Sequence, residues 1–181
     1  STIDTYRLVS SSLLPTPAKS HYTFNLRDMS RVIQGLCLLR KESLQGTDDV
    51  VKCWAHECVR VFEDRLIDKA DHNWFKEQLK QIMETNFKRK WSSLVTVEPL
   101  LFGDFSDPKK NHYQEMSDQS SLQEVMRSLL ADYNSMNSKK QMNLVLFMSA
   151  IEHVARIVRI LRQPLGNALL VGVGGSGRKS L

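Results

Sequence analysis

The residues from Gly166 to Leu181 constrain the fold of this chain most, because an apolar run there leads directly into a Gly-rich stretch. The run 168–171 predicts a β-strand, followed by a loop and the start of a helix. This is the order of elements in a phosphate-binding P-loop. Glycines let the backbone turn tightly and bring its N–H groups close to phosphate oxygens. A single strand cannot form a sheet, so we expect the other strands to lie downstream or in a neighbouring domain.

The stretch matches the motif G-x-x-x-x-G-K-[ST] only in part. Gly172 and Gly177 have the required spacing, but Arg178 replaces the lysine and Lys179 replaces the hydroxyl residue that binds Mg²⁺. Arg178 can still neutralise phosphate charge through its planar guanidinium, whereas Lys179 cannot bind Mg²⁺. The predicted nucleotide-binding residues are Gly172, Val173, Gly174, Gly175, Ser176, Gly177, Arg178, Lys179 and Ser180. The alternative is an ordinary Gly-rich turn between a strand and a helix.

The composition is that of a globular protein with one core or two small ones. Of its 181 residues, 41% are hydrophobic and 25% are charged, and the net charge of +5 is scattered along the chain. No apolar run is long enough to cross a membrane, and no signal peptide opens the sequence. The first residue is Ser1 rather than methionine, which indicates a segment of a longer protein.

The three cysteines do not suggest a disulfide framework, which favours a reducing compartment inside the cell. Cys53, His56 and Cys58 are close in sequence, but they share one helical pattern and lack a second pair of ligands. We therefore expect these three residues to be structural and predict no metal site.

The first half of the chain has the periodicity of a helical bundle over about 25–86. A weakly helical pattern at 1–12 precedes two prolines, and Asn25 is placed to cap a helix that ends before Gly46. Thr47 is predicted to cap a second helix, and Asp71 to open a third. The predicted core positions are Met29, Val32, Ile33, Leu36, Cys37, Leu39, Val50, Val51, Trp54, Cys58, Val61, Phe62, Leu66, Trp74, Phe75, Leu79, Ile82 and Met83.

The second half of the sequence has a less regular pattern than the first. Residues 94–99 have strand chemistry but end at proline, and 100–112 is typical of a linker anchored by Phe102 and Phe105. A helical face returns over 122–133, and residues 142–162 are predicted to form the longest helix. Overall, the sequence predicts a mainly α fold.

Several segments, in this order, resemble one family. KSHYTFNLRDMSRVIQG at 19–35, WAHECVRVFEDRL at 54–66 and DHNWF at 71–75 are similar to the helical lid of the third AAA+ module of dynein heavy chains. MNLVLF at 142–147, IEHVARI at 151–157 and GNALLVGVGGSG at 166–177 are similar to the opening of the fourth module. The form GVGGSGR is closer to axonemal than to cytoplasmic heavy chains.

The resemblance implies a helical AAA+ lid bundle, followed by helices that lead into the first strand and P-loop of an α/β AAA+ module. Residues 1–90 would complete the third module and its lid, 91–121 would be a linker, and 122–181 would begin the fourth module. The parent would be an ATP-driven, minus-end-directed microtubule motor of the axoneme, with a ring of six modules of which the third and fourth are mainly regulatory. We expect the segment alone to hydrolyse no ATP, because it shows neither an activating acid nor a Mg²⁺ ligand.

The resemblance also implies the ligands and partners. ATP or ADP would be bound, with Mg²⁺ in the intact module. The partners would be neighbouring modules of the same chain, and microtubules and dynein light and intermediate chains through the parent; nucleic acid and membranes are not expected. The parent would contain a coiled coil and lie in the cytoplasm and cytoskeleton, in the axoneme of a cilium or flagellum.

Arg27 is the candidate for the lid arginine that reaches the nucleotide of the third module, and Arg31, one turn further on, is the second candidate. A guanidinium at the edge of a lid can bridge phosphate oxygens. The alternative for each is an arginine that is solvated or paired with an acid.

Two further alternatives come from the sequence. The basic residues His153, Arg156, Arg159 and Arg162 could form a contact surface or a solvated helix face. The whole segment could instead be a helical interaction module whose Gly-rich turn binds no nucleotide. Binding of nucleic acid through the basic helix has no recognition motif to support it.

Overall fold

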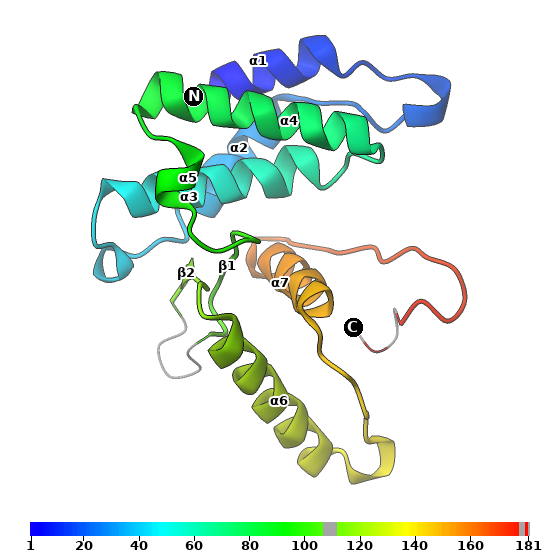
Figure 1. The fold of residues 1–181 in the computed structure, drawn as a ribbon. Coiled ribbons are helices and arrows are strands. Elements are labelled where there is room, and N and C mark those ends of the chain that lie inside the picture. Colours follow the sequence, from blue (N-terminus) through cyan, green and yellow to red (C-terminus); the bar gives the residue numbers. More distant parts are fainter. Residues whose placement is uncertain (107–111, 178–179, 181) are drawn as a thin grey trace. The chain divides into compact units, whose positions relative to one another are not determined.

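The computed structural model describes residues 1–106, 112–177 and 180, which form two units, 1–100 and 101–181 (Figure 1). Both units are mainly helical, as the sequence predicts, and a two-stranded sheet lies in the second. None of the described helices is both long enough and apolar enough to cross a membrane.

The 1–100 unit is a helical bundle. Its α-helices are α1 (Thr2–Ser12), α2 (Leu26–Leu36), α3 (Thr47–Cys58), α4 (Lys69–Ile82) and α5 (Trp91–Leu94). Short 3-10 turns occur at Pro17–Lys19 and Lys41–Ser43, and α3 and α4 continue as single π-helical turns, Val59–Glu63 and Met83–Phe87. The predicted bundle over about 25–86 is therefore confirmed.

Aromatic side chains form the centre of this bundle. The Phe62 ring lies 6.1 Å from that of Phe24 and 6.3 Å from that of Phe75, and the Trp54 ring meets that of Phe87 edge-on at 4.9 Å. Trp54 also donates a hydrogen bond from Nε1 to Oγ1 of Thr2, which ties α3 to α1. These aromatic residues therefore pack the core.

Helices α2 and α3 approach closely at Gly35. A Cβ added to Gly35 would overlap the carboxyl group of Glu57, a side chain with no exposed surface. Glycine is therefore required here by the space between the helices rather than by the backbone conformation.

The cysteine and histidine residues at 53–58 lie in the core of this unit. Cys53, Cys58 and His56 are all buried, and Nδ1 of His56 donates to the carbonyl oxygen of Leu100 at 3.0 Å. Burial raises the pKa of the Cys58 thiol, which keeps it protonated and unreactive. In the part of the chain that the structure describes, no group of three or more His, Cys, Asp or Glu residues could hold a metal ion.

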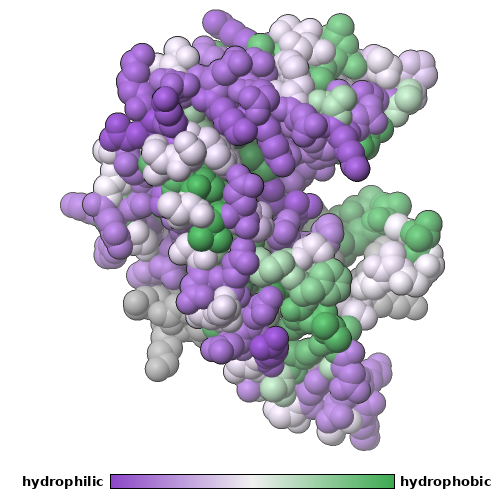
Figure 2. Space-filling model, viewed as in Figure 1, coloured by the Kyte–Doolittle hydropathy of each residue, from purple (hydrophilic) through white to green (hydrophobic). Residues whose placement is uncertain are grey.

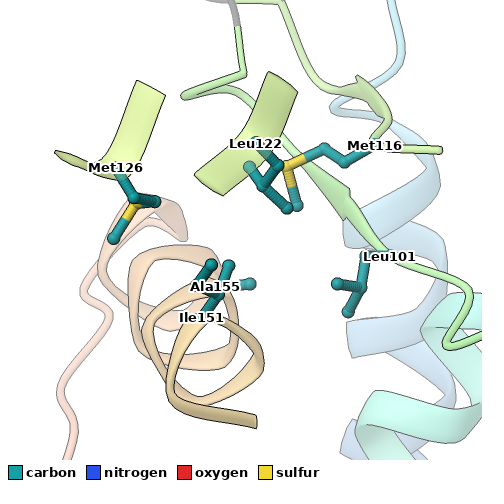
Figure 3. Packing of buried hydrophobic residues seen from close by; sticks show 6 residues of the cluster. All are labelled: Leu101, Met116, Leu122, Met126, Ile151 and Ala155. Atoms are coloured by element: carbon teal, nitrogen blue, oxygen red, sulfur yellow. The ribbon is translucent and has the colours of Figure 1, made fainter. Parts of the chain in front are cut away.

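The 101–181 unit pairs two helices over a small sheet. Strands β1 (Phe102–Gly103) and β2 (Gln114–Glu115) are antiparallel, with Phe102 opposite Glu115. Helices α6 (Gln119–Met136) and α7 (Met148–Arg162) follow, with a 3-10 turn at Ser138–Lys140 between them. Figure 3 shows the apolar core that joins these elements: Leu101, Met116, Leu122, Met126, Ile151 and Ala155.

Several details of the sequence prediction were wrong. Helix α3 begins at Thr47, so the residue before it, Gly46, occupies the cap position, and Asp49 accepts hydrogen bonds from the N–H groups of Gln45 and Gly46. Helix α2 ends at Leu36, so Ile33 and Cys37 at its end are exposed, as is Val50 in the first turn of α3. Each of these residues lies near a helix end, where the neighbouring helices no longer cover the predicted apolar stripe.

The second half of the chain differs more. Residues 94–99 form no strand, although Leu94 and Val95 are buried at the end of α5. The helix predicted from residue 142 begins at Met148, so α6 is the longest helix. The side-chain amide of Asn134 bonds to both backbone groups of Met142, at 2.8 and 2.9 Å, and this pairing holds the chain extended before α7.

Candidate functional site

The N-terminus of α2 displays both candidate lid arginines. Oδ1 of Asn25 accepts a hydrogen bond from the N–H of Arg27 at 2.9 Å, and Oδ2 of Asp28 accepts one from the N–H of Asn25 at 2.9 Å. This reciprocal cap confirms Asn25 as the start of the helix. It also fixes the first turn on which Arg27 stands.

Arg27 and Arg31 share one exposed face of α2, because residues four apart in a helix are neighbours. The Arg27 side chain makes no hydrogen bond or ion pair within the described ranges 1–106 and 112–177. The Arg31 side chain is 61% exposed, and its Nη1 lies 3.7 Å from Oδ1 of Asp28. The structure thus brings the two candidates together on one surface.

Two cations at this end of a helix are electrostatically unfavourable. The N-terminal end of a helix carries a partial positive charge, which favours anionic side chains or ligands there. The cap already uses the N–H groups of Asn25 and Arg27, so a phosphate would be bound by the two exposed guanidinium groups near this positive end of α2. This arrangement breaks a local rule of helix stability in the way that functional sites often do.

Behind the arginine pair lies a charge network that the sequence did not predict. Asp28 is only 2% exposed, and its Oδ1 accepts a hydrogen bond from Nη2 of Arg65 at 2.7 Å. Nη1 of Arg65 donates to the carbonyl oxygen of Thr23 at 3.1 Å, and the guanidinium lies 4.8 Å from the centre of the Phe24 ring. Arg65 comes 37 residues after Asp28, so no local pattern could have identified the pair.

A second network fastens the segment before α2 to the start of α4. Nζ of Lys19 lies 2.6 Å from carboxylate oxygens of both Asp68 and Asp71, and the Tyr22 hydroxyl donates to Asp71 at 2.8 Å. The hydrogen bond from Lys19 lowers the pKa of Asp71, and the bonds that Lys19 donates to Asp68 and Asp71 raise the pKa of Lys19. Burial raises the pKa of Tyr22, so its hydroxyl remains a donor.

This network predicts an acid-dependent contribution to stability. A carboxyl with a lowered pKa stabilises the fold above its usual pKa, near 4, and this contribution is lost as the pH falls through the lower folded-state value. We therefore expect Asp71→Asn to lower the free energy of unfolding by about 1 kcal/mol at pH 7, and by much less at pH 3.

Urea unfolding at the two pH values measures this difference. Glu77→Gln, which removes an exposed ion pair with Lys80 on the same helix, is the control and is expected to change the stability little at either pH. Equal losses for Asp71→Asn at pH 7 and pH 3 would show that its charge is not what stabilises the network.

The Gly-rich loop is the second candidate element. Gly175 and Gly177 have φ values of +81° and +79°, which side chains other than glycine rarely adopt. The N–H of Ser176 bonds to the carbonyl oxygen of Val173 at 3.3 Å, and that of Ser180 to Gly177 at 2.9 Å. Apart from chain neighbours, no heavy atom of the described residues lies within 4 Å of a Cβ added to Gly174, Gly175 or Gly177. The predicted residues Arg178 and Lys179 lie outside the described residues.

The strand predicted before this loop does not form. Residues 168–171 have no strand partner among the described residues, and Leu169 and Val171 are 90% and 82% exposed. Figure 2 shows apolar surface on this C-terminal segment. Exposed apolar side chains on an extended chain are expected where a sheet must be completed by other strands.

A tight turn precedes this segment. The N–H of Gly166 bonds to the carbonyl oxygen of Gln163 at 2.9 Å, and Leu165 has a φ of +57°. A Cβ on Gly166 would overlap the carbonyl oxygen of Ile160, so only glycine fits. The turn reverses the chain at the end of α7.

The basic face of α7 is partly neutralised within its own unit. Arg156 lies 3.7 Å from Glu152, and Nε of Arg162 lies 2.7 Å from Oδ2 of Asp104. His153 is exposed. These ion pairs favour a solvated helix face over a surface for an acidic partner.

Comparison with known proteins relates the region of the α2 arginines and the region of the Gly-rich loop to the same kind of protein. Residues 2–95 match the model of the AAA+ lid domain, and residues 142–181 match that of the P-loop containing dynein motor region D4. Dynein axonemal heavy chain 1 of Mus musculus is 45% identical over 99% of this chain, and dynein axonemal heavy chain 2 of the same species is 46% identical over 99%. Dynein-1-beta heavy chain of the flagellar inner arm I1 complex of Chlamydomonas reinhardtii is 43% identical over 99%. The chain spans only 4% of the length of each of these three relatives.

Proposed function

This chain belongs to the family of axonemal dynein heavy chains, and on that premise we propose that it links two nucleotide sites of the motor ring. Residues 1–90 would supply the lid over the nucleotide of the third module, and residues 122–181 would supply the phosphate loop of the fourth. Residues 91–121 would connect them. In this proposal the segment transmits the nucleotide state of one module to the next and hydrolyses nothing by itself.

The observation that carries this proposal is the pair of exposed arginines on the capped first turns of α2. Arg27 and Arg31 extend from a helix whose N-terminus already attracts anions, and they lie within the region that matches the AAA+ lid. The left-handed glycines of the 172–177 loop support the phosphate site of the next module in the same way.

The activity of the parent is part of the proposal. It would be an ATP-driven, minus-end-directed microtubule motor of a cilium or flagellum, with Mg²⁺ beside ATP or ADP in each complete site. Its partners would be microtubules and dynein light and intermediate chains, and a coiled coil would lie outside this segment. Arg178 would neutralise phosphate charge in the fourth module, while Lys179 would add a cation where the motif has a Mg²⁺ ligand.

Removal of the lid arginines tests the proposal. In the parent heavy chain, Arg27→Ala and Arg31→Ala are each expected to weaken ATP binding at the third module by about tenfold or more, because a charge-assisted hydrogen bond to phosphate contributes about 1.5–3 kcal/mol. ATP titration of a motor domain in which only the third module keeps an intact phosphate loop measures this affinity.

Arg7→Ala is the matched control, because Arg7 is an exposed arginine on α1 of the same unit. It should leave the affinity unchanged. If the Arg27 and Arg31 variants also bind ATP normally, both arginines are solvated surface residues, and the helical interaction module becomes the better interpretation.

A further inference from the structure

We propose that Arg65 is a positioning residue of the lid, which neutralises Asp28 and so keeps Arg31 turned outward for the nucleotide. This inference rests on the proposed function, because it assigns a partner to the arginine face of α2. Arg65 comes 34 positions after Arg31 in the sequence, and helix α3 lies between them along the chain.

Arg65 is placed to satisfy a carboxylate that has no access to water. Asp28 is 2% exposed, and its two oxygens accept from Nη2 and Nη1 of Arg65 at 2.7 and 3.4 Å. Asp28 also accepts the N–H of Asn25, but a buried carboxylate is strongly unfavourable unless a cation neutralises it. The stacking of Arg65 on Phe24 and its hydrogen bond to Thr23 hold its guanidinium in this position.

Arg31 is the nearest competitor for the same carboxylate. Its Nη1 lies 3.7 Å from Oδ1 of Asp28, the oxygen that Arg65 already holds at 2.7 Å. The Arg31 side chain is 61% exposed because Arg65 has taken the closer position. Without Arg65, Asp28 would draw Arg31 inward, away from the face that it shares with Arg27.

The test measures ATP affinity at the third module of the parent heavy chain. Arg65→Met should weaken ATP binding by about tenfold, about as much as the loss of Arg31 itself. Adding Asp28→Asn to Arg65→Met removes the charge that attracts Arg31, while the amide oxygen can still cap α2, and should restore the affinity to within about twofold. Arg65→Lys keeps a cation beside Asp28 and should retain most of the affinity.

The other variants separate this inference from simpler ones. In an Arg31→Ala background, Arg65→Met should cause no further loss, because the two changes act through the same side chain. Arg89→Met, which breaks the exposed pair with Asp48, is the control for removing an ion pair from the unit and should leave the affinity unchanged. Urea unfolding of each variant shows whether the lid remains folded.

Two outcomes overturn the inference. If Arg65→Met binds ATP normally while Arg31→Ala does not, Arg65 does not position Arg31. If the double variant Arg65→Met, Asp28→Asn remains folded but binds as weakly as Arg65→Met, Arg65 acts as a structural clamp. A further outcome concerns the proposed function instead: if Arg31→Ala itself binds ATP normally, Arg31 does not contact the nucleotide.

Discussion

Replacing Gly35 with alanine is expected to lower the free energy of unfolding of the 1–100 unit by about 2 kcal/mol. Alanine in a helix interior is normally more stable than glycine by up to about 1 kcal/mol, so the expected change has the opposite sign. The reason is the added Cβ, which would overlap the carboxyl group of Glu57. Glu57 has no exposed surface, so moving its carboxyl group aside would disturb the packing around it.

Gly46→Ala provides the matched control for this prediction. Gly46 has an extended backbone with a φ of −175°, and no atom lies within 4 Å of a Cβ added there. Because alanine is a poorer N-cap than glycine, this replacement should cost at most about 1 kcal/mol, which is less than the loss expected for Gly35→Ala. Urea unfolding followed by circular dichroism compares the two variants. A Gly35→Ala variant as stable as the unchanged chain would contradict the close packing of α2 on α3.

Truncation of Ile151 should have the largest effect in the 101–181 unit. Ile151 has no exposed surface and lies in α7 at the centre of the core in Figure 3, between α6 and the residues that flank the sheet. Ile151→Ala removes three carbon atoms and leaves a cavity, which costs about 3 kcal/mol in well-packed cores. Hydrogen exchange of the α6 and α7 amides measures this loss of local stability.

Leu161→Ala on the same helix is the control. Leu161 is 58% exposed, so its truncation should change the protection of the same amides by less than about 0.5 kcal/mol. Similar losses for the two variants would mean that α7 has no defined buried face.

Helical periodicity predicted most of the 1–100 unit, because helices that bury one face leave a repeating apolar pattern. Trp54, Phe62 and Phe75 were predicted to be core residues and are buried. The helix ends were less predictable, since caps depend on single residues; Asn25 has a side chain that caps α2, whereas Gly46 has none.

The second half was harder to predict because tertiary contacts decide its structure. The run 142–147 has apolar residues that fit a helix, but Asn134 pairs with the backbone of Met142 and keeps it extended. Val95 has strand propensity, but β1 and β2 form further along the chain. A strand needs a neighbour for its hydrogen bonds, so propensity alone could not place one here.

The residues of the candidate site also differ in how far the sequence could predict them. The arginines at 27 and 31 were proposed from the family resemblance and the loop glycines from their spacing, and both remain predictions. Arg65 and Lys19 were missed, since their partners lie far away in sequence. Such contacts become visible only when the fold brings the segments together.

The most direct test of the link between two nucleotide sites is the affinity of the fourth module for ATP and ADP. It is measured in the parent heavy chain, with and without Mg²⁺, for the unchanged chain and for Arg178→Ala. We predict micromolar binding that Arg178→Ala weakens by about tenfold or more. Absence of binding in a well-folded motor domain would contradict the account. Residues 172–180 would then be a structural turn, and the segment would be a mechanical element between modules.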